Sequence, residues 1–314
     1  MLKKEIKKST RDAYGEELLS LAKKDKKIVV VSADLPESTR IHHFAQKFPQ
    51  RFIECGVAEQ NALGIANGLA LAGKTAYLSS FAVFSPGRNW DQLRVSVCYS
   101  NTNVKIVSTH SGLAVGEDGA SHQALEDIAI TRCLPNLIVI APVDYLETKK
   151  ALQAINKIKG PVYLRLTRNK TNIITNTKTP FKIGQANIIK KGKDITIVAC
   201  GPIMNEVLLA AKELRKKKIS IEIINNHTIK PLDKKTILNS IKKTKRLMTV
   251  EDHQRHGGMG SAIIEMMAQN YPVPTKIIGV NDTFGESGTP EQLYKKYHLN
   301  YKDIIKEILK LLKK

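Results

Sequence analysis

The chain has 314 residues, of which 42% are hydrophobic and 25% are charged, and its formal net charge is +21. This much apolar sequence excludes a disordered chain, and the length favours two domains. The charge raises nucleic-acid binding as an alternative, but aromatic residues make up only 5% and are not interleaved with the lysine runs. We therefore favour solvated lysine-rich helix faces, whose positive field would steer anionic substrates inward, over a base-stacking surface.

The cysteines and the N-terminal residues indicate a cytoplasmic protein. The four cysteines lie far apart and form no CxxC pair, at Cys55, Cys98, Cys133 and Cys200. This spacing argues against a disulfide framework and against a cysteine zinc site. The sequence begins without an apolar signal-peptide core, and no apolar run is long enough to span a bilayer. We expect a reduced cytoplasmic chain that binds neither membrane nor nucleic acid.

Apolar β-branched runs alternate with helical patterns along the first half of the chain. The residues Ser9–Asp12 resemble a capping box and predict the start of a helix. Strands are expected at 28–31, 76–78, 104–107, 137–140 and 162–166, and helices at 62–71, where Gly73 is the stop signal, and at 145–158. This alternation predicts a mostly parallel sheet with helices on both faces.

A polar stretch at 169–180, rich in Thr and Asn, lacks periodicity and predicts a linker. After it come expected strands at 195–198, 219–224, 247–250 and 276–280, and expected helices near 204–217, 258–269 and 301–312. The predicted class is therefore α/β, with two domains at 1–170 and 186–314 joined by a linker at 171–185. Each domain should be a mostly parallel sheet with helices on both faces.

Four polar clusters are expected at the carboxyl ends of strands in the first domain, where open α/β sheets bind their ligands. They are Ser32–Asp34, Ser79–Phe81, Ser108–His110 and Arg165–Arg168. A single polar group at such a place is common. Several together, with a histidine and a carboxylate among them, predict one cleft.

Three further segments deserve a chemical interpretation. Glu59 opens an alanine-rich helix. At that position the helix dipole stabilises a carboxylate, which by itself accounts for the residue. The segment His110–Gln123 is a glycine-rich loop with two histidines and two acids, which suits close backbone approach to a ligand and proton transfer near neutral pH. Its spacing fits no standard metal-ligand pair. Gly257–Ser261 does not match a dinucleotide-binding loop and is interpreted as a plain turn.

Four segments occur in the order seen in transketolases, which the chain resembles over nearly its whole length. They are Gly56–Asn61, Phe81–Phe84, His110–Gln123, and Glu251–Gln254 followed by Gly257–Gly260. The resemblance covers the pyrimidine-binding and C-terminal domains of that family, without its N-terminal domain and its Gly-Asp-Gly metal motif. It implies the second subunit of a two-chain transketolase, a glycolaldehyde transferase of the pentose phosphate pathway. Such an enzyme moves a two-carbon ketol unit from a ketose phosphate to an aldose phosphate.

The resemblance implies thiamine diphosphate as the cofactor. Glu59 then resembles the acid that bonds to pyrimidine N1′ and drives the imino tautomer that deprotonates the thiazolium C2. Phe81 and Phe84 resemble the aromatics that flank the pyrimidine, and Asp34 resembles the acid near the thiazolium. The implied cofactor-binding residues are Asp34, Glu59, Phe81, Phe84 and Arg88.

The family's third pocket aromatic is replaced by Gly87 in this sequence. Arg88 or Trp90 could supply the missing cover for the pyrimidine ring.

On the substrate side, the resemblance gives His110 and His122 contact with the sugar, and we expect them to handle its hydroxyl protons. Asp118 resembles the acid that reads a substrate hydroxyl. Arginine suits a terminal phosphate because its fork binds oxyanions through two parallel bonds. The residues expected to hold that phosphate are Arg11, Ser38 and Arg168.

The resemblance also implies a partner: an N-terminal transketolase subunit that carries the diphosphate site and the ligands of Mg²⁺ or Ca²⁺. We expect two copies of each chain in a heterotetramer, α2β2, with the copies of this chain in contact, and no metal ligands on this chain. The alternatives are the beta subunit of a 2-oxoacid dehydrogenase, a deoxyxylulose-phosphate synthase-like enzyme and, from another class, a basic nucleic-acid-binding protein.

Overall fold

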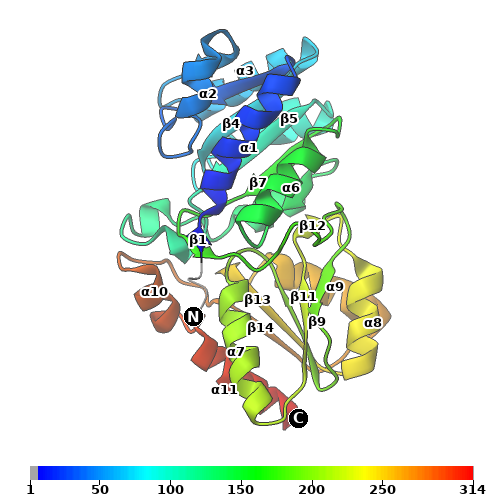
Figure 1. Ribbon diagram of the computed structural model, residues 1–314. Coiled ribbons are helices and arrows are strands. Elements are labelled where there is room, and N and C mark those ends of the chain that lie inside the picture. The colour runs from blue at the N-terminus through cyan, green and yellow to red at the C-terminus, as the bar shows by residue number, and fades with distance from the viewer. Residues whose placement is uncertain (1–5, 314) are drawn as a thin grey trace.

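The computed structural model describes residues 6–313. Residues 1–5, on which the expectation of no signal peptide rests, and Lys314 lie outside it. Two sheets, one built mainly from each half of the chain, lie one above the other with helices packed around them (Figure 1). The expected fold class is confirmed, because both sheets are mostly parallel and helices cover their faces.

The first sheet has seven strands in the order β12-β6-β7-β5-β4-β2-β3. All pairs are parallel except the edge pair of β12 with β6. Its strands are β2 (Ile28–Ser32), β3 (Phe52–Glu54), β4 (Thr75–Phe81), β5 (Val104–Thr109), β6 (Ile138–Ile140), β7 (Val162–Arg165) and β12 (Thr228–Lys230).

Apolar stripes pack helices on both faces of this sheet. One core cluster joins the sheet to α1 (Thr10–Lys24), α2 (His42–Lys47) and α6 (Tyr145–Ile155). Another joins it to α3 (Glu59–Leu71), the π-helix η2 (Leu93–Tyr99) and α5 (Asp127–Arg132). As expected, Ser9 caps α1, where its hydroxyl accepts a hydrogen bond from the Asp12 N–H. Gly73, with φ +82°, follows the end of α3.

The second sheet has five strands in the order β14-β13-β10-β11-β9, and only β9 is antiparallel to its neighbour. These strands are β9 (Asn187–Lys190), β10 (Ile195–Ala199), β11 (Ile221–Asn225), β13 (Leu247–Gln254) and β14 (Thr275–Val280). The helices around it are α7 (Met204–Lys216), α8 (Lys234–Thr244), α9 (Met259–Asn270), α10 (Pro290–Lys296) and α11 (Tyr301–Leu312). Among the described helices, none combines the length and the apolar character needed to cross a bilayer.

The structure holds helices that were not expected, α2, α5, α8 and α10, and it departs from the expected elements in three further ways. Ser79–Phe81 forms the end of β4 rather than a loop after it. Part of the expected linker is a strand, because β8 (Thr171–Asn172) pairs with β1 (Lys7–Lys8). The strand β12 leaves the second half of the chain and completes the first sheet. The domain boundaries given above stay a prediction.

Candidate active site

Glu59 is a buried carboxylate at the first position of α3. Gly56, with φ +64°, turns the chain after β3, so that Glu59 enters the first helical turn, where the helix dipole favours a negative charge. Its side chain is 5% exposed, and both oxygens accept from Arg88 Nη1, at 3.0 and 3.2 Å. The side chain of Arg88 is 51% exposed. Among residues 6–313, Arg88 is the one side chain that bonds to this carboxylate, and solvent or a ligand can replace it.

Two phenylalanines form a wall beside this carboxylate. Phe81 ends β4, and its ring lies nearly parallel to that of Phe84, with centroids 5.9 Å apart. The Arg88 guanidinium lies 4.3 Å from the centre of the Phe84 ring while it bonds to Glu59. A flat cationic group thus fits between the aromatic face and the carboxylate. A protonated aminopyrimidine ring requires the same two features, an aromatic face to stack on and a carboxylate to bond to.

The backbone explains why no third aromatic stands here. A Cβ on Gly87 would lie 2.1 Å from the Val83 carbonyl oxygen, so a larger residue does not fit without a shift of the turn. Trp90 is engaged elsewhere, because its indole N–H donates to the Ile130 carbonyl at 2.6 Å. Of the two expected substitutes, Arg88 is the one that covers Phe84.

His110 lies against the same wall from the sheet side. Its ring stacks on Phe81 with centroids 3.7 Å apart, and it is 3% exposed. Burial, followed by repulsion from Arg11 and Arg168, lowers the pKa of His110 to about 3, so the ring is neutral near pH 7. Arg11 can only donate, so the Nε2 atom 3.3 Å from Arg11 Nη1 accepts. The proton then sits on Nδ1, which donates to Thr109 Oγ1 at 2.8 Å.

His122 approaches from the far end of the glycine-rich loop. It ends the short 3₁₀ turn η4 (Ala120–His122), and its ring meets Phe84 edge-on with centroids 5.3 Å apart. Ser121 Oγ lies 2.9 Å from its Nδ1. The two predicted histidines, twelve positions apart in sequence, therefore meet at one aromatic wall.

The residues expected to hold a phosphate gather around an open hollow of about 390 Å³. Arg11 Nη1 donates to the Ser38 carbonyl at 2.9 Å, and Arg168 Nη1 donates to Asp118 Oδ1 at 3.0 Å. Burial, with repulsion from Arg40 next, lowers the pKa of Arg11 to about 10, which leaves it charged at neutral pH. The lining residues are Arg11, Glu37, Ser38, Arg40, Asp118 and Arg168.

Sequence reasoning missed Arg40 and Glu37 in this hollow. Arg40 has φ +70° in the turn after β2, where no motif marks it, and it pairs with Asp12 at 2.9 Å. Asp34, by contrast, lies apart from the predicted groups. Its side chain is exposed, and its N–H donates to Glu54 Oε1 at 2.7 Å. In the part of the chain that the structure describes, it makes no hydrogen bond to Glu59 or His110, so its place beside the cofactor stays a prediction.

Within residues 6–313, no group of three or more His, Cys, Asp or Glu side chains is placed to hold a metal ion. The expected location of the metal on a partner subunit stays a prediction. The geometry on this chain supplies a buried acid, an aromatic wall, a neutral histidine and a basic hollow.

Two family models match the sequence. The model described as transketolase, pyrimidine binding domain matches residues 6–173, and the model described as transketolase, C-terminal domain matches residues 184–304.

Two relatives match over nearly their whole length. A protein of Methanocaldococcus jannaschii, "Putative transketolase C-terminal section", is 47% identical over 98% of this chain and 97% of its own length. A 6-deoxy-6-sulfo-D-fructose transketolase subunit of Clostridium sp. is 40% identical over 94% of this chain and 92% of its own length. A solved structure described as a split gene transketolase, inactive beta4 tetramer, is 40% identical, covers 97% of this chain and 98% of its own, and has a TM-score of 0.88.

Proposed function

The chain belongs to the transketolase family, and we propose that it is the second subunit of a split transketolase that depends on thiamine diphosphate. The proposed reaction transfers a two-carbon ketol unit from a ketose phosphate to an aldose phosphate in the cytoplasmic pentose phosphate pathway. One observation carries the proposal: buried Glu59, the Phe81–Phe84 wall and neutral His110 lie together although three separate segments supply them.

The cofactor, when bound, would supply a thiazolium C2 that becomes nucleophilic on losing its proton. Glu59 would hold a proton at pyrimidine N1′, in place of the Arg88 cation that it binds in this structure. By holding that proton, Glu59 would favour loss of the C2 proton from the bound cofactor. The pyrimidine would stack on the face of Phe84 that the Arg88 guanidinium covers in this structure.

The histidines would handle the protons of the sugar. A ketol must lose a hydroxyl proton before its C2–C3 bond breaks, and an aldehyde acceptor must regain one. His110 is suited to the first step because it is neutral, and its Nε2 already accepts a hydrogen bond from Arg11. A substrate hydroxyl that displaces the Arg11 N–H would meet the same acceptor. His122 faces the same wall and is only partly buried, so it can exchange protons with solvent.

The basic hollow supports sugars that end in an oxyanion. Arg11, Arg40 and Arg168 converge there. Arg40 is paired with Asp12 and Arg168 with Asp118, whereas Arg11 makes no ion pair among the described residues. A terminal phosphate could therefore accept from the Arg11 guanidinium and compete for the other two. The Clostridium relative is named for a sulfonated ketose, whose terminal group is also an oxyanion. We expect phosphate as the preferred terminal group of the substrate.

The diphosphate and its metal ion, Mg²⁺ or Ca²⁺, would be held by an N-terminal-type partner subunit. Two observations on similar proteins support this division. One relative is named as a C-terminal section, and the solved tetramer of a split-gene chain is described as inactive. The active assembly would contain two copies of each subunit.

The test is reconstitution with the N-terminal-type subunit of the same genome, thiamine diphosphate and Mg²⁺. Xylulose 5-phosphate and ribose 5-phosphate should give sedoheptulose 7-phosphate, read by chromatography, and neither subunit alone should do so.

Arg168→Ala should raise KM for the phosphorylated donor about ten- to hundredfold and leave KM for an unphosphorylated ketose nearly unchanged. Lys170→Ala, which removes a nearby cation that does not line the hollow, is the control. Carbon dioxide release from pyruvate without a seven-carbon product would move the assignment to a 2-oxoacid dehydrogenase.

A further inference from the structure

The glycine-rich loop that carries Asp118 and His122 is fastened to the second domain, and Asp252 makes the central contact. Asp252 lies near the end of β13 and is 5% exposed. Its Oδ1 accepts from the Leu113 N–H at 2.9 Å, and its Oδ2 accepts from the Ala114 N–H at 3.2 Å. These N–H groups open the 3₁₀ turn η3 (Leu113–Val115), where no carbonyl of the turn can reach them. A carboxylate from another domain therefore caps the loop's first turn.

Gly112 shows how closely the loop and this carboxylate fit. A Cβ on Gly112 would lie 2.2 Å from Asp252 Oδ2, and its φ of +75° is itself unfavourable for a residue with a side chain. The Gly112 N–H donates to the Ala124 carbonyl at 2.9 Å, which closes the base of the loop. The first turn of the loop is thus pressed between its own base and Asp252.

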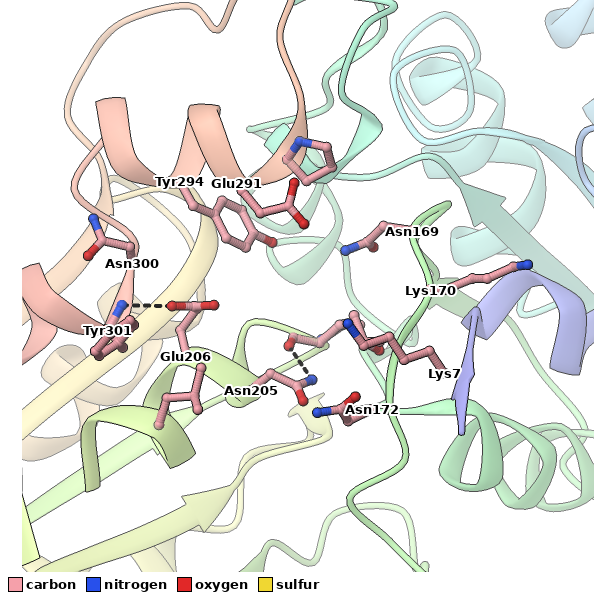
Figure 2. A pocket seen from close by; sticks show the side chains of 14 residues that line it. Lys7, Asn169, Lys170, Asn172, Asn205, Glu206, Glu291, Tyr294, Asn300 and Tyr301 are labelled. Carbon is pink, nitrogen blue, oxygen red and sulfur yellow. Dashed lines mark hydrogen bonds between the residues drawn. The ribbon is translucent and has the colours of Figure 1, made fainter. Parts of the chain in front are cut away.

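Asp252 is held in place by groups from both domains. The Tyr294 hydroxyl donates to its Oδ2 at 3.0 Å, and Arg165 Nη2 donates to its main-chain carbonyl at 2.9 Å. Arg165 is itself fixed by an ion pair with Asp127 at 2.7 Å. Figure 2 shows Tyr294 and Glu291 of α10 on one side of a hollow between the domains, with Asn169 on the other side.

The far end of the loop is fastened to the same domain. Gln123 Nε2 donates to the Glu286 carbonyl at 2.9 Å, and the Gln254 N–H donates to the Leu125 carbonyl at 2.7 Å. Between the two ends lie Asp118 and His122, which face the basic hollow and the aromatic wall. The position of both groups therefore depends on contacts that the second domain makes at either end of the loop.

We propose that Asp252 is a positioning residue for the substrate side of the site, so that the C-terminal domain sets the geometry of Asp118 and His122 without itself touching substrate. This inference rests on the proposed function. Asp252→Asn keeps one acceptor oxygen, so one of the two buried N–H groups, that of Leu113 or of Ala114, loses its acceptor and faces an amide NH2 donor. This favours a loosened turn. A looser loop lowers the fraction of molecules that are ready to bind sugar, which raises KM and leaves cofactor binding intact.

The test compares Asp252→Asn with Glu251→Gln. Glu251 is the neighbouring residue, is equally buried, and accepts from the N–H groups of Met259 and Gly260 at 2.7 and 2.8 Å. It caps α9, however, and not the loop, so it is a matched control for loss of a buried capping carboxylate. Tyr294→Phe removes a single hydroxyl from Asp252 and serves as a milder variant that should fold if Asp252→Asn does not.

Hydrogen exchange of the purified chain is the first measurement. Amides of residues 112–123 should exchange about tenfold faster or more in Asp252→Asn, and to a smaller degree in Tyr294→Phe, but at the wild-type rate in Glu251→Gln.

In the reconstituted enzyme, Asp252→Asn should raise KM for the ketose phosphate about tenfold with little change in cofactor affinity. Wild-type exchange in the loop, or wild-type KM despite a loosened loop, would overturn the inference. An inactive wild-type assembly would instead overturn the proposed function.

Discussion

Glu59 and Arg88 illustrate how single residues at this site have two possible partners. The Glu59 carboxylate is buried at the start of α3, and its cation is a half-exposed arginine whose guanidinium lies flat on Phe84. The pair satisfies a buried charge, because an unpaired carboxylate there would be costly. A ring that presents a nitrogen to Glu59 and a face to Phe84 can take the place of Arg88.

The first prediction concerns this exchange of partners. Glu59→Gln keeps the shape of the side chain but removes the group that holds a proton at pyrimidine N1′, so C2 hydrogen–deuterium exchange of bound thiamine should slow about a hundredfold or more. The rate is read by NMR after acid quench of the reconstituted complex. Glu213→Gln, which changes an exposed acid of α7, is the control. An unchanged C2 rate in Glu59→Gln would leave the residue only its role in the helix.

His110 gives a prediction about pH. Its folded pKa of about 3 lies below the ordinary value of 6.5, so between these values the unfolded chain binds more protons than the folded chain. Stability should therefore rise with pH across this window, and the contribution is lost as the pH falls through it. His110→Gln removes the group, so its free energy of unfolding in urea should change less between pH 7 and pH 4 than that of the wild type. Equal changes in the two proteins would show that His110 protonates freely in the folded state.

At the scale of elements, short polar segments are held by carboxylates that accept several hydrogen bonds. Asp144 caps α6, where it accepts from the Glu147 N–H at 2.8 Å, and it also accepts from the N–H of Ile174 at 2.7 Å and the hydroxyl of Thr175 at 2.9 Å. A helix of the first domain thereby fixes part of the predicted linker. These contacts set the path between the domains together with apolar packing of Ile174, Phe181 and Ile183.

The corresponding prediction is a difference between two helix caps. Asp144→Ala should lower the free energy of unfolding by about 3 kcal/mol, because several buried donors lose a charged acceptor. Asp233→Ala is the matched control, since Asp233 caps α8 through the Thr236 N–H at 3.0 Å and accepts from the Ala186 N–H at 2.8 Å, but is less buried. It should cost about 1 kcal/mol. Urea unfolding at neutral pH measures both, and equal losses would contradict the role given to the linker contacts.

Most long elements of the fold could be predicted from the sequence, because buried parallel strands are continuous apolar runs. Ile28–Ser32 and Val104–Thr109 are fully buried and were expected nearly to their observed ends. The edge strand β12 was missed, since Thr228–Lys230 is too short to carry a pattern and its partner β6 lies in the other half of the chain. The helix α8 was missed although one of its faces is apolar, because lysines fill the opposite face.

In the candidate site too, residues in local motifs could be predicted and residues placed by tertiary contacts could not. Residues inside local motifs, such as Glu59 and His122, could be singled out from the sequence, and the structure brings them to one aromatic wall. Asp252 also lies in a recognisable segment, but its contact with Leu113 joins positions 139 residues apart. Arg40 lines the hollow from an unremarkable turn. Both roles come from tertiary packing, which the local sequence pattern does not reveal.

At the scale of the whole molecule, one large apolar side chain remains exposed next to the site. Val57 is 69% exposed and stands two residues before Glu59. An exposed apolar side chain beside a functional site is a candidate contact with another chain. A subunit that covers Val57 would stand beside Glu59, where a split site needs its diphosphate-binding half.

The assembly can be tested at this position. Val57→Asp should weaken assembly with the partner subunit about tenfold or more, because it places a charge in an apolar contact. The equivalent change at Ile188, which is 43% exposed on β9 of the second sheet, should have little effect. Sedimentation velocity measures assembly, and calorimetry measures thiamine diphosphate binding, which should be tight only for the assembled pair. Tight cofactor and Mg²⁺ binding to this chain alone would contradict a shared site. Normal assembly of Val57→Asp would place the contact on another face of the molecule.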